Sequence, residues 1–111
     1  MTIQQQINKT IDDLQKFESS IIVIQTFFNI PEFTEFKHVS EDGESGDPAC
    51  MVLTSSEYVV IIDYYHAEIC KLSSHSSKTF YFPKDRTANY SFPFSWVNTF
   101  AQLIEEGTIT M

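Results

Sequence analysis

Four residues in the middle of the chain have side chains that bind zinc in proteins: Cys50, His66, Cys70 and His75. On a helix, the H-x3-C spacing of His66 and Cys70 would put both on one face, about 6 Å apart. On a strand the same spacing separates them by about 13 Å, at about 3.3 Å per residue, which is too far to share an ion. Residues 67–72 have strand-like composition and there is no C-x-x-C pair, so we expect no metal site and no cofactor.

The same residues raise the question of thiol catalysis. Cys70, with a histidine and Asp63 nearby in the sequence, has the residue types of a thiol enzyme. The chain has no nucleophile elbow, no phosphate-binding glycine loop and no H-E-x-x-H motif. With only three glycines there is little material for a cofactor-binding loop. We therefore expect a protein that is not an enzyme, and a small thiol- or metal-dependent enzyme remains an alternative.

The stretch EDGESGD, residues 41–47, is the most polar part of the chain, with carboxylates at Glu41, Asp42, Glu44 and Asp47. Calcium loops need carboxylates at alternating positions and a distant closing Glu, a pattern that these acids do not match. Residues 32–47 hold one lysine and six carboxylates, so this window carries −5 of the net charge of −8. Such charge repels nucleic acids and anionic membranes, and it suits a protein partner with a basic surface or simple solubility.

Aromatic residues form the third feature, and most of those between residues 80 and 100 are expected in the core. Tyr64 and Tyr65 come directly after an apolar run, where they would form a contact surface if they face solvent. Tyrosine is favoured as an anchor in protein interfaces. The predicted partner-binding residues are therefore Glu35, Glu41, Asp42, Glu44, Asp47, Tyr64 and Tyr65.

Periodicity predicts the elements that position these residues. Ile3, Ile7, Ile11, Leu14, Phe17, Ile21, Ile24 and Phe28 recur at spacings of three and four, which predicts one helix over about 3–28. An alternative breaks that helix at Ser19–Ser20. Pro31 must end it, because the residue before a proline avoids helical angles. Residues 95–107 predict a second, amphipathic helix with Ser95 as N-cap and Gly107 as C-cap.

The region between the helices is β-rich. Residues 49–54 and 57–63 are apolar and β-branched around Ser55–Ser56, which indicates a hairpin. Further strands are expected over 67–72 and 79–83, with a short one over 36–39. Residues 72–78 read as a loop and 84–87 as a turn. Residues 88–92 are expected to return along the sheet edge, because Pro93 cannot donate to a ladder.

Together these elements predict a single α+β domain over residues 1–111. Its N-terminal long helix is followed by an antiparallel sheet of about four to five strands, and its C-terminal amphipathic helix packs on the sheet. The longest apolar run, residues 21–24, is far shorter than the roughly 20 residues of a membrane span. The N-terminus lacks the features of a signal peptide, so we expect a cytoplasmic protein with reduced cysteines.

Size, acidity and the lack of catalytic motifs favour a protein-binding module. The hypothesis is a dedicated inhibitor, such as an immunity protein against a toxin or a phage or plasmid factor against host defence. It would block a basic or nucleic-acid-handling protein by steric and electrostatic occlusion. The alternatives are a subunit of a larger complex and a homo-oligomeric adaptor, with a homodimer through the N-terminal helix.

Overall fold

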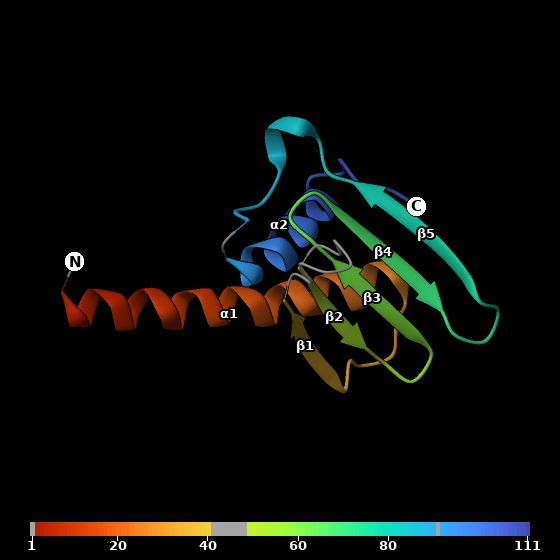
Figure 1. Ribbon diagram of the computed structural model, residues 1–111, viewed down its shortest axis with the longest axis horizontal. Helices are drawn as coiled ribbons and strands as arrows, with labels where there is room; N and C mark the ends of the chain where they lie inside the picture. Colours follow the sequence, from red (N-terminus) through yellow and green to blue (C-terminus); the bar gives the residue numbers. More distant parts are fainter. Residues whose placement is uncertain (1, 41–48, 91) are drawn as a thin grey trace.

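The structure is a computed structural model that describes residues 2–40, 49–90 and 92–111, with the side chains of residues 7–11 and 13 outside that description. Helices packed with an antiparallel sheet make up these described residues (Figure 1), which confirms the α+β class predicted from the sequence. In chain order the elements are α1 (Ile3–Phe28), β1 (Glu35–Val39), β2 (Cys50–Thr54), β3 (Tyr58–Ile62), β4 (His66–Lys71), β5 (Ser76–Tyr81), the 3₁₀ turn η1 (Lys84–Arg86) and α2 (Pro93–Glu105).

Helix α1 runs through Ser19 and Ser20 without a break. Serine is a weak helix former, because its hydroxyl competes for backbone hydrogen bonds. Here the Ser20 hydroxyl lies 2.8 Å from the Lys16 carbonyl oxygen one turn back and 2.8 Å from Oδ1 of Asn98 on α2. The helix ends at Asn29, whose φ of 54° is left-handed, two residues before Pro31. The predicted continuous helix is thus confirmed.

The five strands form an antiparallel meander in the order β1-β2-β3-β4-β5. The predicted hairpin is confirmed, with Ser55 and Ser56 in the turn between β2 and β3. The turns at both ends of β3 have the same arrangement of side-chain-to-backbone hydrogen bonds. In each, the side-chain oxygen of the first residue, Ser55 or Asp63, accepts N–H groups from the residues two and three positions later. Both Ser55 and Asp63 are buried, and these hydrogen bonds give their side-chain oxygens partners within the turn.

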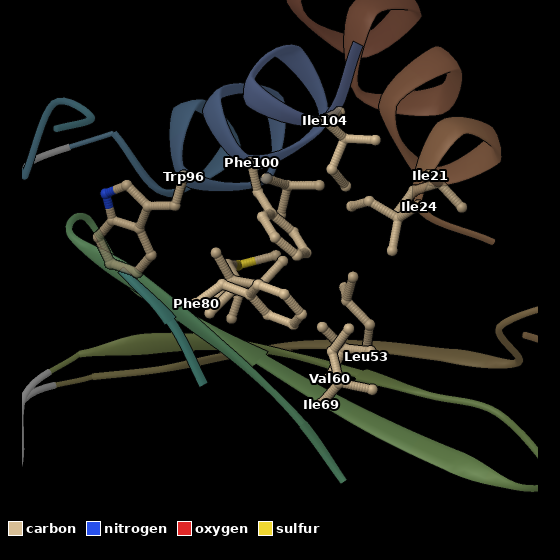
Figure 2. Packing of buried hydrophobic residues seen from close by; sticks show 14 of the residues in the cluster. Ile21, Ile24, Leu53, Val60, Ile69, Phe80, Trp96, Phe100 and Ile104 are labelled. Carbon is tan, nitrogen blue, oxygen red and sulfur yellow. The ribbon is translucent and has the colours of Figure 1, made fainter. Parts of the chain in front are cut away.

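Both helices pack on the same face of the sheet, and the core lies between them and that face (Figure 2). Alternation along the strands directs every second residue inward, including Leu53, Val60 and Ile69. From α2, Trp96 and Phe100 enter the core almost fully buried. The core also takes Ile21 and Ile24 from α1, while the N-terminal half of α1 extends beyond the rest of the molecule (Figure 1).

Three sequence-based predictions about local structure are wrong. Residues 88–90 form no strand, because their backbone groups make hydrogen bonds elsewhere. The Ala88 N–H donates to the Tyr64 carbonyl, and the Asn89 carbonyl accepts from Nε1 of Trp96. Strand β5 begins at Ser76, inside the predicted loop, because it pairs with β4 as far as Lys71. Helix α2 begins at Pro93, with Phe92 at the N-cap position in place of Ser95.

The C-terminal end of α2 explains an apparent mismatch in the sequence. Glu106 follows the last turn of the helix, where the dipole disfavours an acidic side chain. Its two carboxylate oxygens accept a bidentate pair of hydrogen bonds from Arg86 of η1, at 2.7 and 2.8 Å. This pairing raises the pKa of Arg86 and lowers that of Glu106. Gly107, predicted as the C-cap, lies one residue beyond the observed C-cap, Glu106, and turns the chain with a φ of 79°.

Candidate functional site

Four tyrosines and a histidine gather around the turn between β3 and β4. We call this group the tyrosine patch: Tyr64, Tyr65, His66, Tyr81 and Tyr90. The ring centroids of Tyr64 lie 5.0 Å from Tyr65 and 5.1 Å from Tyr90. The His66 ring lies 4.5 Å from Tyr65 and stacks on Tyr81 at 5.8 Å. Tyr65, Tyr81 and Tyr90 are exposed, and Tyr81 keeps 70% of its accessible surface. The patch is therefore a continuous aromatic surface open to solvent.

The turn that carries the patch is held from several sides. Oδ1 of Asp63 accepts the backbone N–H groups of Tyr65 and His66 at 2.9 and 2.8 Å. The segment after β5 crosses the same turn, where the Phe82 N–H donates to the Tyr65 carbonyl at 2.8 Å. The Ala88 N–H likewise donates to the Tyr64 carbonyl, at 2.8 Å. Four hydrogen bonds thus hold the backbone under the patch.

Asp63 also approaches the His66 ring. Its second oxygen, Oδ2, lies 2.7 Å from Nδ1 of His66, while Oδ1 holds the backbone. The ring N–H does not point along the line to that oxygen, since Nδ1 lacks an aligned hydrogen bond. The contact is therefore a close approach between a carboxylate and a ring nitrogen, with Asp63 almost fully buried beneath the turn. The same imidazole contacts the rings of Tyr65 and Tyr81.

The phenol of Tyr65 has a raised pKa. Partial burial is the largest cause that raises the pKa of Tyr65, and the nearby Asp63, Tyr64 and Tyr81 add to it. At neutral pH the Tyr65 hydroxyl therefore remains a hydrogen-bond donor as well as an acceptor. Such a surface offers apolar rings and polar tips together, which is the combination that makes tyrosine effective at interfaces.

The predicted partner-binding residues fall into three groups. Tyr64 and Tyr65 lie in the patch. Glu35 is exposed at the far end of β1, where it pairs with Thr54 at the opposite end of the sheet from the patch. The four carboxylates Glu41, Asp42, Glu44 and Asp47 lie outside the described residues.

The described residues on either side of that acidic stretch do have a clear position. Val39 ends β1 and pairs with Cys50, the first residue of β2. In the next register step, Met51 pairs with Ile62 at the end of β3, one residue before the turn that begins at Asp63. The chain therefore leaves β1 and enters β2 at the same end of the sheet as the tyrosine patch.

The candidate thiol and metal residues are separated. His66 and Cys70 lie on the single strand β4, and Cys50 lies two strands away on β2. Partial burial is the main cause that raises the pKa of Cys70, and a hydrogen bond from its thiol to Oε1 of Glu68, at 3.3 Å, adds to it. A nucleophilic cysteine needs the opposite shift. Within the part of the chain that the structure describes, no three His, Cys, Asp or Glu residues are placed to hold a metal ion.

The sequence reasoning missed Tyr81 and Tyr90 as surface residues. Tyr81 alternates with Phe80 and Phe82, both of which are buried, so the strand period already put it on the other face of the sheet. Its position opposite His66 required the register of β4 with β5. Tyr90 had no usable signal, because the stretch around it was predicted as a strand.

Concave surfaces occur elsewhere among the described residues. Two adjoining apolar cavities of about 500 and 350 Å³ share Leu14, Phe17 and Phe36 and lie between α1, β1 and the start of α2. A smaller hollow of about 270 Å³ near the chain's C-terminus has Phe28 and Phe80 in its lining and Lys71 and Lys78 beside them. We call the first pair of cavities the apolar groove.

Comparison with known proteins gives no family for the chain: no family model, no curated protein and no solved structure matches it. In the described residues, no helix combines the length and apolar character needed to cross a membrane.

Proposed function

We propose that this chain is a small, acidic, non-enzymatic protein-binding module that acts in the cytoplasm as a dedicated inhibitor. Its target is a basic or nucleic-acid-handling protein, of the kind blocked by toxin-immunity proteins or by phage and mobile-element proteins against host defence. The observation that carries the proposal is the exposed tyrosine patch on a fixed turn, at the sheet end where the acidic connector, residues 41–48, begins and ends.

The aromatic side chains supply the affinity in this proposal. Interface energy concentrates in a few buried anchors, and Tyr, Trp and Arg are the commonest of them. Tyrosine loses little conformational entropy on binding, because only two side-chain angles must be fixed. The turn under Tyr64 and Tyr65 is already held by Asp63, Phe82 and Ala88, so binding orders little additional backbone.

The acidic connector supplies the rate of association and the choice of partner. A cluster of carboxylates attracts a basic surface over roughly a Debye length, about 8 Å at physiological salt. Such complementarity speeds encounter more than it strengthens the final complex. A protein that handles nucleic acid presents a basic surface of this kind, and occlusion of that surface would inhibit it.

A tagged pull-down from native-host lysate, with and without nuclease treatment, tests this function. Proteins encoded beside the gene, such as a toxin or phage component, are included. The chain is compared with a triple variant, Tyr65→Ser, Tyr81→Ser and Tyr90→Ser, and with Leu72→Ser, a change of an exposed apolar residue in the turn at the other end of β4. We expect one stoichiometric basic partner that survives nuclease, with affinity at least about tenfold lower for the triple variant alone.

Loss of binding in both variants, or equal binding in both, contradicts the role of the patch. The absence of any partner contradicts the inhibitor function itself. Circular dichroism of each variant separates a lost surface from a lost fold, because all four substituted side chains are exposed.

A second comparison tests the connector. The variant Glu41→Ser, Asp42→Ser, Glu44→Ser, Asp47→Ser is matched to Asp12→Ser, Glu18→Ser, Glu57→Ser, Glu105→Ser, which removes the same charge from exposed positions elsewhere. We expect the connector variant to associate with the partner more slowly than the control, with a gap that closes at high salt. Equal association rates for the two variants would sink the role given to the connector.

A further inference from the structure

The N-terminal half of α1 projects beyond the other elements (Figure 1). It begins with a complete capping box, in which Thr2 and Gln5 each accept from the other's backbone N–H, at 3.1 and 2.9 Å. The whole helix of 26 residues is about 39 Å long, at about 1.5 Å per residue. Helical segments of about 12–15 residues are marginal in water without a packing partner. The projecting turns therefore call for a surface to pack against.

The projecting segment carries an apolar face that is exposed to solvent near both of its ends. Ile3 retains 76% of its accessible surface, and Leu14 is also exposed. By their spacing in the sequence, Ile3, Leu14 and Phe17 lie on one side of the helix, in line with buried Ile21. The stripe that fills the core thus continues along α1 past the point where the core ends.

The apolar groove begins where the projecting segment leaves the body. Phe17 packs against Phe36 of β1 at 5.7 Å and against Phe94 of α2 at 5.0 Å between ring centroids. Phe36 nevertheless keeps 47% of its surface exposed, because β1 is an edge strand paired only with β2. The floor of the groove is therefore aromatic and accessible, next to the exposed side of Leu14.

We propose that two copies of this chain associate around a two-fold axis, the projecting half of each α1 lying in the apolar groove of the other. Each copy has both a projecting helix and a groove. A single two-fold rotation therefore covers both surfaces in both copies, and the assembly closes as a dimer. An antiparallel pair that sets Ile3 opposite the partner's groove at the level of Phe17 places the axis near residue 10. The mode is an amphipathic helix in a hydrophobic groove, with anchors at helical spacing.

The charge distribution favours a second copy as the occupant. Two molecules with a net charge of −8 repel each other at most surfaces. Residues 3–16, however, hold two lysines and two aspartates, so the projecting segment has no net charge. The groove that it would enter has Glu18 and His38 as its polar members, and the rest of its lining is apolar: Leu14, Phe17, Ile21, Phe36, Met51, Phe92, Pro93 and Phe94. The projecting segment and the groove lining therefore bring few charges of the same sign together.

The proposal goes beyond the partner-binding function, and the two surfaces share no residue. Sedimentation velocity tests it across a concentration series up to about 100 μM. We expect the wild-type chain to reach twice its mass of 12.8 kDa. Ile3→Asp and Phe36→Asp should each weaken the dimer at least about tenfold. The matched control Ile22→Asp changes an apolar α1 residue that is 61% exposed on another side of the helix, and it should remain dimeric.

Ile3→Asp is a fair test because it does not threaten the helix. An acidic side chain in the first helical turn interacts favourably with the helix dipole. The far-ultraviolet circular dichroism of this variant should therefore equal that of the wild type when both are monomeric. A monomer at all concentrations overturns the proposal, and so does a dimer that survives both substitutions.

Cross-linking distinguishes reciprocal insertion from other dimers. In a Cys50→Ser, Cys70→Ser background, an Ile3→Cys copy is mixed with a differently tagged Phe36→Cys copy and oxidised. We expect a disulfide-linked product that carries both tags. The matched mixture of Ile3→Cys with Ile22→Cys should give little product. Equal yields in the two mixtures contradict the proposed arrangement even if the chain is dimeric.

Discussion

The carboxylate of Asp63 lies 2.7 Å from Nδ1 of His66 and at the same time accepts the backbone N–H of that residue at 2.8 Å. A single buried side chain therefore contacts both the backbone of the turn and the imidazole in the tyrosine patch. The same carboxylate adds to the causes that raise the pKa of Tyr65. Asp63 is thus the structural link between the end of β3 and the aromatic surface.

Asp63→Ala should destabilise the fold by about 2–3 kcal/mol, because two backbone donors lose their acceptor in a buried site. Asp63→Asn keeps an acceptor oxygen of the same shape and should cost about 1 kcal/mol or less. Urea denaturation measures the free energy of unfolding of both variants. The Ala variant should also bind the partner more weakly, because the tyrosine patch would be displaced. Equal stability of the Ala variant and the wild type would contradict this role.

A second prediction concerns the contact between the helices. Ser20 and Asn98 are buried, and the Ser20 hydroxyl lies 2.8 Å from Oδ1 of Asn98. Asn98→Ala should cost about 1–3 kcal/mol, because it removes a partner from a buried polar group. A double-mutant cycle with Ser20→Ala should give a coupling energy of at least about 0.5 kcal/mol. Ser19→Ala, an exposed neighbour, serves as the control, and strictly additive effects of the first two changes would refute the coupling.

A third prediction follows from the thiol of Cys70. Its pKa is raised by partial burial and by the hydrogen bond to Glu68, so less of the reactive thiolate is present at a given pH. Alkylation of Cys70 at pH 8 should be slower in the native chain than in urea. Glu68→Gln should speed it in the native chain, because the substitution removes the neighbouring charge. Mass spectrometry of the labelled peptides measures the rates, and native alkylation faster than denatured alkylation would reverse the argument.

A fourth prediction concerns the pH dependence of the pair between Arg86 and Glu106. Because the folded-state pKa of Glu106 is lowered, the pair stabilises the fold above the unfolded carboxyl pKa of about 4.3. The contribution is lost as the pH falls through the folded-state value. Glu106→Gln should therefore lower the melting temperature slightly at pH 7, less so in high salt, and have no effect at strongly acidic pH. Glu105→Gln is the control, and the same small change in both variants would show that the pair contributes nothing.

Much of this architecture was predictable from local patterns. The spacing of apolar residues located α1 and α2, because a helix with one buried face repeats that face every three or four residues. The β-branched runs on either side of Ser55–Ser56 located the central hairpin, because such runs favour strands and a short polar stretch between them favours a turn. Local patterns did not decide whether α1 breaks at Ser19–Ser20, because the hydrogen bond between Ser20 and Asn98 joins residues far apart in the sequence.

The candidate site, in contrast, depended on the tertiary structure. The sequence named Tyr64 and Tyr65, but Tyr81 joined them through the register of β4 with β5, and Tyr90 through the segment that crosses the turn. It also grouped Glu35 with the acidic connector, although Glu35 lies four residue steps, about 13 Å, from Val39 at the end of that strand. Glu106 looked misplaced until Arg86 was found beside it. Periodicity reports which face of an element is buried, whereas pairing between elements decides which exposed residues meet.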